Sequence, residues 1–215
     1  MDFILSVEGI QCCSLSCIHN FIETIPLEKL GINQQILTQI LSLVFNAEPI
    51  SKQLMEESTN TLRALITRMP ALNLTADQLE VLCSRCQTIG SLSVKMNVIN
   101  LMSILAQRST DLQFIEKITV LLMAGLQTES DLVLKAELFD ALIDIHSEDN
   151  KTDSLLIKLD LINRLKQLAV LFKNEVSPGI LFNFMLSSAL HQIYGKFFKL
   201  EKKVMKTSFY WVIIF

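Results

Sequence analysis

The stretch LVLKAELFDALIDIHSEDN, residues 132–150, decides the fold. At about 100° per residue its apolar side chains cover an arc much wider than the single stripe of a surface helix. That arc consists of Leu134, Ala136, Leu138, Phe139, Ala141, Leu142, Ile143 and Ile145. A helix that is apolar over so wide an arc must contact neighbours on at least two sides. The segment is therefore expected to be an inner helix of a stack rather than the outside of a compact bundle.

The composition bounds the class of protein. Of 215 residues, 50% are hydrophobic and 19% are charged, and glycine and proline are scarce, which excludes a disordered or collagenous chain. No strand-like alternation bounded by turn residues is present, so the chain is expected to be all-α. The net charge of −3 leaves no basic footprint, and direct nucleic-acid binding is not expected.

Helical segments recur along the chain at a regular spacing. Eight can be marked, at 7–24, 32–45, 50–69, 75–88, 91–107, 111–127, 130–147 and 151–173. The odd-numbered and the even-numbered segments each advance by about 40 residues, which is the period of HEAT and armadillo arrays. The spacing predicts a HEAT/armadillo-type α-solenoid of about four helix pairs over residues 1–176.

An acidic strip fills the remaining side of the helix over 130–147. It is formed by Glu137, Asp140, Asp144 and Glu148, at i, i+3, i+7 and i+11. Like charges on one rigid face attract cations, so the strip is a candidate contact for a basic partner. The alternative is an ordinary solvated face.

In HEAT-type arrays the first helix of each pair usually lines the convex side, and ligands favour the concave side. The even-numbered helices, which are the second helices of their pairs, therefore offer a second candidate contact surface. Its polar residues show no preference for one sign of charge. They are Gln34, Gln35, Gln39, Asp77, Glu80, Arg85, Glu116, Lys117 and Lys158.

The five cysteines are the remaining candidates for chemistry. Cys83 and Cys86 form a CxxC, but no second CxxC, histidine pair at ligand spacing or βαβ pattern accompanies them. We therefore interpret them as small hydrophobic residues of a repeat core. The same interpretation covers Cys12, Cys13 and Cys17. Their odd number, and a start (MDFILSVEG) without the features of a signal peptide, favour a reduced intracellular compartment.

No catalytic constellation is visible. The histidines His19, His146 and His191 are scattered, and there is no phosphate loop, GxSxG or HExxH. We expect no enzymatic activity, no catalytic or metal-binding residue and no cofactor.

Three segments carry a resemblance to a known family: SVKMNVINLMSILAQ (93–107), LVLKAELFDALIDIHSED (132–149) and LLIKLDLINRLKQLAVLFKNEV (155–176). In order and spacing they resemble the C-terminal part of the symportin family of HEAT-repeat nuclear import and ribosome assembly adapters. The matching features are the helix LFDALIDI, the acidic loop after it, and a long helix that ends at Phe172-Lys173. The resemblance covers about residues 10–176.

The resemblance implies a function. Such adapters hold 5S-RNA-binding large-subunit ribosomal proteins, couple them to an importin, and escort them from the cytoplasm to the nucleus for assembly. Importin binding is expected only through family repeats that are missing here. A generic HEAT-repeat scaffold for protein interactions is the alternative.

Residues 177–215 depart from the family pattern. They contain clustered phenylalanines, a lysine-rich stretch and the apolar end FYWVIIF. The apolar stretch 179–195 is interrupted by polar residues and is shorter than the ~20 residues that a membrane-spanning helix needs, so no membrane span is expected. The segment is expected to be either a capping helix or a non-native tail.

Overall fold

The computed structural model describes residues 7–26, 34–45, 51–89 and 91–147, with short stretches between 152 and 167 and Lys202. These described residues form seven α-helices and no strand. The chain divides into two compact units, residues 1–105 and 106–215.

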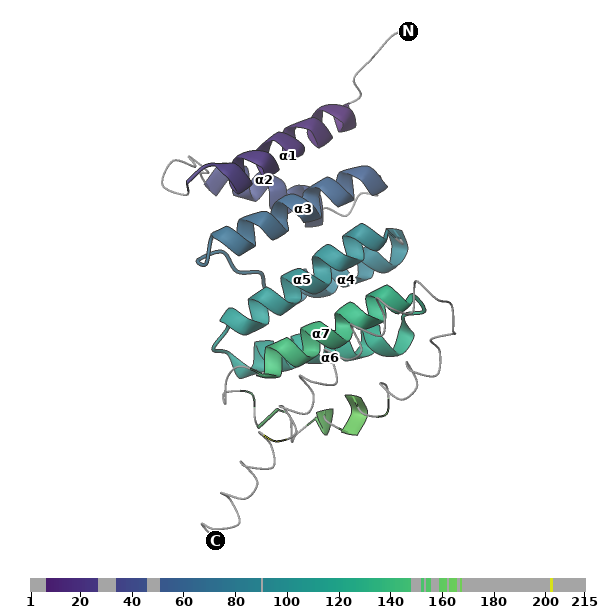
Figure 1. Cartoon of the computed structure of the whole chain (residues 1–215). Coiled ribbons are helices and arrows are strands. Elements are labelled where there is room, and N and C mark those ends of the chain that lie inside the picture. Colours follow the sequence, from purple (N-terminus) through teal and green to yellow (C-terminus); the bar gives the residue numbers. More distant parts are fainter. Residues whose placement is uncertain are drawn as a thin grey trace. The chain divides into compact units, whose positions relative to one another are not determined.

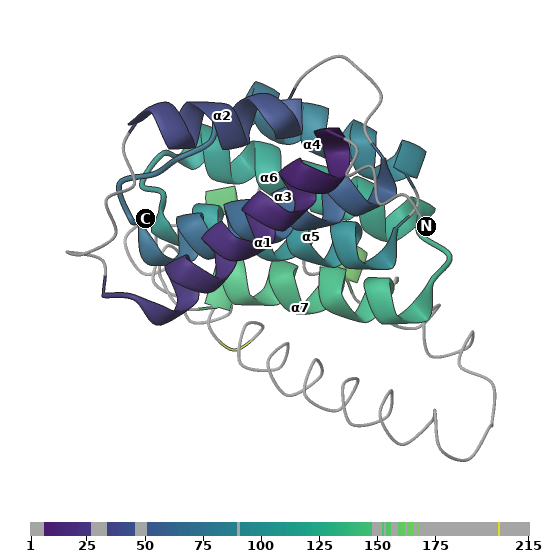
Figure 2. The same ribbon diagram turned by 90° about the horizontal axis from the view of Figure 1, so that it is seen from above.

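The first unit is built from two layers of helices. It contains α1 (Val7–Thr24), α2 (Gln34–Phe45), α3 (Lys52–Arg68), α4 (Ala76–Ile89) and α5 (Leu92–Arg108), whose last turn passes the unit boundary. In this unit α1, α3 and α5 lie side by side in one layer, and α2 and α4 lie behind them in a second layer (Figures 1 and 2). This alternation is the arrangement expected of stacked helix pairs.

Hydrogen-bonding side chains at the helix starts explain two of the boundaries. Ser51 precedes α3, and its hydroxyl accepts a hydrogen bond from the Leu54 amide at 3.1 Å. Thr75 and Gln78 form a capping box at the start of α4: the Gln78 amide donates to the Thr75 hydroxyl, and the Thr75 amide donates to the Gln78 side chain. These contacts satisfy amides that have no partner inside the helix.

Hydrogen bonds fix the register of α1 against α3. The Thr61 hydroxyl donates to the Glu57 carbonyl at 2.7 Å and shares this hydrogen with the Leu15 carbonyl of α1 at 3.3 Å, and the Arg68 guanidinium donates to the Ile22 carbonyl. Both pairs that join α3 to α1 are 46 residues apart in sequence, so the two helices run parallel. Parallel first helices are what a repeat array requires, because every pair of helices enters the stack in the same direction.

The α3–α5 register is fixed in the same way. The Asn97 amide nitrogen lies 3.5 Å from the Thr59 hydroxyl oxygen to which it donates, and the Ser91 hydroxyl donates to the Glu56 carboxylate. These partners are 38 and 35 residues apart and advance together, so α5 is parallel to α3. The offsets lie close to the repeat of about 40 residues predicted from sequence.

Two arginines hold the C-terminal ends of the helices in the preceding pair. The Arg68 guanidinium of α3 donates to Ile22 O and, at 3.0 Å, to Ile25 O at the end of α1. In the second layer, the Arg85 guanidinium of α4 donates to Val44 O of α2 at 2.9 Å. The last carbonyls of a helix lack intrahelical donors and carry the negative end of its dipole. A guanidinium supplies these carbonyls with hydrogen-bond donors and its positive charge interacts favourably with the dipole.

The core of the first unit joins three of its helices. Its buried residues come from α1, α2 and α3 and are Cys12, Leu15, Ile22, Ile40, Leu54, Ala64 and Leu65. Their interdigitation removes apolar surface from water, which is the main favourable contribution to the stability of such a stack.

The second unit contains α6 (Leu112–Thr128) and α7 (Leu132–Ser147), which pack against each other. Asp111 precedes α6 and accepts a hydrogen bond from the Gln113 amide at 2.9 Å. Asp131 precedes α7 and accepts one from the Val133 amide at 2.8 Å. Both helices therefore begin where a side chain caps them.

The wide apolar arc of α7 is confirmed. Its buried apolar residues are Leu134, Leu138, Phe139, Ala141, Leu142, Ile143 and Ile145. Ala136, at the edge of the arc, is half-buried, and Val133 is 40% exposed. The helix is thus buried over much more than one stripe, as the sequence predicts.

The predicted segment bounds agree with the first seven helices to within two residues. The eighth segment, 151–173, is interrupted where it is described. Asp160 has a φ of 47°, a left-handed conformation that aspartate tolerates better than most residues and that ends a helix. The prediction of one continuous helix there is wrong. Apart from Lys202, residues 177–215 lie outside the described residues, as does the boundary at 176/177.

Gly125→Ala is expected to stabilise the second unit. Gly125 lies inside α6, where glycine costs up to about 1 kcal/mol relative to alanine. A Cβ at this position would lie 3.5 Å from the Leu138 side chain, an ordinary van der Waals distance. We expect a gain of about 0.5–1 kcal/mol in the free energy of unfolding, measured by urea denaturation. Unchanged or lower stability would show that α6 and α7 pack more tightly here than the structure indicates.

Candidate functional site

The acidic strip lies on α7. Glu137, Asp140 and Asp144 are all half-buried, and each interacts with another group of the chain. Glu148 lies outside the described residues. Three carboxylates therefore share one side of a helix whose other sides are buried. They are less exposed than an ordinary solvated face, and the prediction that they contact a basic partner stays a prediction.

His146, also on α7, has a structural role. Its side chain is fully buried, and Nε2 lies 3.0 Å from the Thr119 hydroxyl oxygen on α6. The Thr119 hydroxyl already donates its one hydrogen to the Ile115 carbonyl at 2.9 Å, so its oxygen accepts from the imidazole N–H. The pair joins α6 to α7 and holds the helix that carries the strip.

The polar residues of the even-numbered helices are divided between the two units. The exposed members in the first unit are Gln39, Asp77 and Glu80. Arg85 lies in the same unit, and its guanidinium donates a hydrogen bond to the Val44 carbonyl at the end of α2. The others are half-buried in the second unit or have side chains outside the described residues: Glu116, Lys117, Gln34, Gln35 and Lys158. Neither unit gathers described residues of this set into a cluster of one charge.

The CxxC cysteines belong to the packing of the first unit. Burial raises the pKa of the Cys86 thiol to about 12 and that of the half-buried Cys83 thiol to about 11. Cys83 Sγ lies 3.8 Å from Met102 Sδ of α5. Reactive and metal-binding cysteines have lowered pKa values, so both thiols behave as the small hydrophobic residues predicted from sequence.

That prediction is wrong for two other cysteines. Cys12 is buried against α3, but Cys13 and Cys17 are exposed. One and five residues after Cys12, they are rotated to the outward side of α1. The same side carries Ile10 and Phe21, which are 53% and 56% exposed. The prediction placed all three cysteines in the core, whereas α1 turns one side to α3 and these two cysteines lie on another side.

The described part of the chain has neither a cluster of metal ligands nor a helix that could span a membrane. There, no group of three or more histidine, cysteine, aspartate or glutamate side chains could hold a metal ion. Within the same residues, no helix combines the length and the apolar character needed to cross a bilayer.

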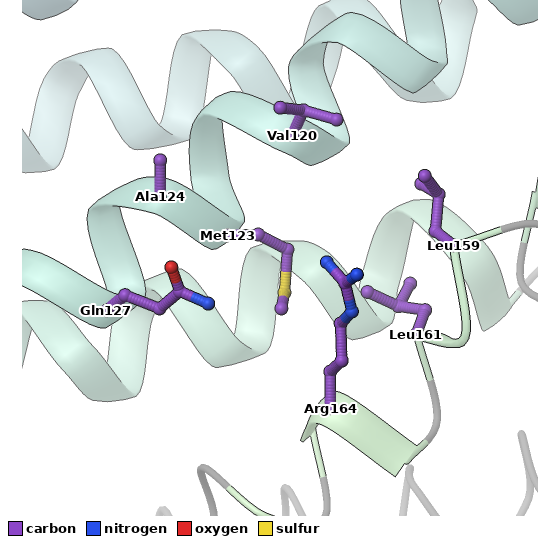
Figure 3. A pocket seen from close by; sticks show the side chains of 7 residues that line it. All are labelled: Val120, Met123, Ala124, Gln127, Leu159, Leu161 and Arg164. Atoms are coloured by element: carbon purple, nitrogen blue, oxygen red, sulfur yellow. The ribbon is translucent and has the colours of Figure 1, made fainter.

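Sequence reasoning missed a pocket in the second unit. It has a volume of about 140 Å³ and lies between α6 and residues 159–164 (Figure 3). It is lined by Val120, Met123, Ala124, Gln127, Leu159, Leu161 and Arg164. The sequence indicates one wall of this pocket, because Val120, Ala124 and Gln127 at i, i+4 and i+7 lie in one row along α6. The opposite wall depends on the break at Asp160, which no sequence pattern indicated.

The helix pairs of the first unit, stacked in parallel at an offset of about 40 residues, define the class of helical-repeat proteins. The family model described as "SYO1-like, TPR repeats" matches residues 1–178. The chain therefore belongs to the SYO1-like family of helical-repeat proteins.

Curated relatives agree with this assignment. The chain is 28% identical over 186 residues to human HEAT repeat-containing protein 3, and 26% identical to the mouse protein of the same name. Each alignment covers 80% of this chain and 27% of the relative, so the chain spans about a quarter of the relatives' length. No solved structure matches the chain significantly.

Proposed function

We propose that this chain is part of an adapter and chaperone for basic large-subunit ribosomal proteins that bind 5S RNA. The observation that carries the proposal is the family match over residues 1–178, because the sequence resembles the symportin family in the same region. The adapter acts by binding alone, without catalysis or a cofactor, and moves between cytoplasm and nucleus with its cargo.

The charge of the chain supports a basic cargo. RNA-binding proteins carry excess positive charge, which must be shielded until they reach their RNA. The chain has a net charge of −3, and Glu137, Asp140 and Asp144 form one acidic side of α7. Because α7 is held by a buried core, these carboxylates are presented on a rigid surface, which raises their attraction for cations. We further propose that importin binding depends on repeats that the relatives have beyond this chain.

A general HEAT-repeat scaffold is the second candidate. It is supported by the polar residues of the even-numbered helices, where Glu116 and Lys117 of α6 carry opposite charges. A surface of mixed charge favours no basic cargo in particular. The two proposals differ in which surface carries the binding.

Changing Glu137, Asp140 and Asp144 together to glutamine tests the acidic strip. The helix should tolerate the change, because glutamine is a good helix former and keeps hydrogen-bonding capacity. Charge contacts near the surface contribute under about 1 kcal/mol each, so we expect roughly tenfold weaker binding at low salt. The difference should shrink at high salt because the ions screen the contacts. The measurement is a fluorescence titration with a basic fragment of a 5S-RNA-binding ribosomal protein, at two salt concentrations.

A charge-matched control separates the strip from net charge. Glu23→Gln, Asp77→Asn and Glu80→Gln also remove three carboxylates, from exposed positions in the first unit. We expect this variant to bind the fragment nearly as tightly as the parent. Equal affinity of the parent and the strip variant for the fragment at low salt would show that the strip is an ordinary solvated surface that does not bind it. A larger loss in the control would show that the fragment binds to the first unit, which carries all three of its changes.

A further inference from the structure

The pocket on α6 combines an apolar lining with two polar side chains. Val120, Met123 and Ala124 form the α6 wall, and Leu159 and Leu161 form the facing wall (Figure 3). At about 140 Å³ its volume is close to that of the roughly 150 Å³ protein cavities that hold a benzene-sized molecule. The space is therefore large enough for one leucine-sized side chain.

The polar side chains at this pocket are Gln127 and Arg164, which come from opposite walls (Figure 3). Among the described residues, no carboxylate pairs with the Arg164 guanidinium. Asp160 is the acidic residue one helical turn before Arg164, but its Oδ1 accepts a hydrogen bond from the Asn163 side chain at 2.8 Å. The guanidinium thus lies at an apolar pocket with its donors available to a ligand.

The break at Asp160 gives the pocket its second wall. With a φ of 47°, Asp160 turns the chain between Leu159 and Leu161, and both leucines line the pocket. The Arg164 amide donates to the Asp160 carbonyl at 3.2 Å, which starts a new helical turn and places Arg164 beside the leucines. A left-handed non-glycine residue costs free energy, and such residues are concentrated at binding sites.

We propose that this pocket binds a peptide segment of a partner protein in which a leucine-sized side chain stands next to a carboxylate. The apolar side chain fills the space between α6 and the two leucines. The carboxylate accepts hydrogen bonds from Arg164, whose planar guanidinium matches it in geometry, and from the Gln127 amide.

This binding mode goes beyond the proposed function and does not rest on it. The strip on α7 is acidic and selects a basic partner, whereas the pocket on α6 carries a cation and selects an acidic one. The two surfaces thus have opposite charge preferences, and one can fail without the other. A chain with both could hold two different partners.

The test uses three acetylated and amidated hexapeptides that differ at the two central positions of Gly-Ser-X-X-Ser-Gly: Leu-Asp, Ala-Asp and Leu-Lys. The readout is the ¹³C-methyl NMR signal of Met123, which lines the pocket and is assigned with a Met123→Leu variant. We expect the Leu-Asp peptide to shift this signal, and the other two to bind about tenfold more weakly. No shift of the Met123 signal by the Leu-Asp peptide at millimolar concentration would overturn the proposal.

Two variants make the test specific. Arg164→Glu should reverse the preference, so that Leu-Lys binds better than Leu-Asp; an unchanged preference would contradict the role of Arg164. Ala124→Phe should fill the pocket and abolish the binding of every peptide. Both positions are exposed, so the fold should be kept. Ser84→Phe, at an exposed position of α4, is the matched control and should bind like the parent. Binding that survives Ala124→Phe would place the peptide elsewhere and refute the proposal.

Discussion

Leu142→Asp is expected to abolish the cooperative folding of α6 and α7. Leu142 is fully buried in the wide apolar arc of α7. The change removes a core side chain, which costs about 2–5 kcal/mol, and adds a carboxylate with no partner, which costs several more. A domain is stabilised by only about 5–15 kcal/mol in total, so little of that stability would remain.

Circular dichroism during thermal melting gives the size of this effect, and hydrogen exchange shows its extent. The amides of α6 should lose protection together with those of α7, because the two helices pack against each other. The control is Val133→Asp, at an exposed position in the first turn of α7, where an acidic residue is compatible with the helix dipole. It should melt within a few degrees of the parent. A Leu142→Asp melt identical to that of the parent would show that the arc is not a core.

Arg68→Met should give the second-largest loss of stability. The guanidinium donates to Ile22 O and Ile25 O at the end of α1, and methionine keeps much of its apolar stem but no donor. Hydrogen bonds from charged groups contribute about 1.5–3 kcal/mol each to stability, and Arg68 is half-buried, so we expect a loss near the middle of that range for the pair. The midpoint of urea unfolding measures it.

Two further variants give the expected order of stabilities. Arg68→Lys keeps the charge but has no planar fork for two carbonyls, so it should fall between the parent and Arg68→Met. Lys52→Met removes one cation from the exposed start of the same helix and should change stability little. If Arg68→Met and Lys52→Met unfold at the same midpoint, the contact between α3 and the end of α1 contributes no stability.

Helical period and capping residues made most of the fold predictable. The side chains of Ser51, Thr75, Asp111 and Asp131 satisfy amides at helix starts, and the predicted segments begin close to each of them. These are local interactions, so the residues that decide them are adjacent in sequence. The arc of α7 was predictable for the same reason, because its period is a property of one segment.

Contacts between distant residues could not be predicted. Arg68 reaches back 46 residues to α1, and Arg85 reaches back 41 residues to α2. Nothing in the local sequence distinguishes these arginines from solvated ones. The exposure of Cys13 and Cys17 likewise depends on which side of α1 meets α3, and periodicity alone does not determine that side.

The candidate site was predictable only in part. Helical geometry predicts that Glu137, Asp140 and Asp144 share one side of their helix. Their half-burial depends on which other residues pack around them, and the spacing of these residues in the sequence does not show that. The pocket on α6 was missed because one of its walls depends on the left-handed turn at Asp160. Aspartate adopts that conformation in a minority of cases, so its presence predicts no turn by itself.

An affinity pull-down of the tagged chain from cell lysate, followed by quantitative mass spectrometry, tests the adapter proposal most directly. The parent chain should enrich the 5S-RNA-binding large-subunit ribosomal proteins over a tag-only control at low salt. The variant with glutamine at Glu137, Asp140 and Asp144 should enrich them less, and the difference should narrow as salt is raised. Recovery of these ribosomal proteins at the level of the tag-only control would contradict the account.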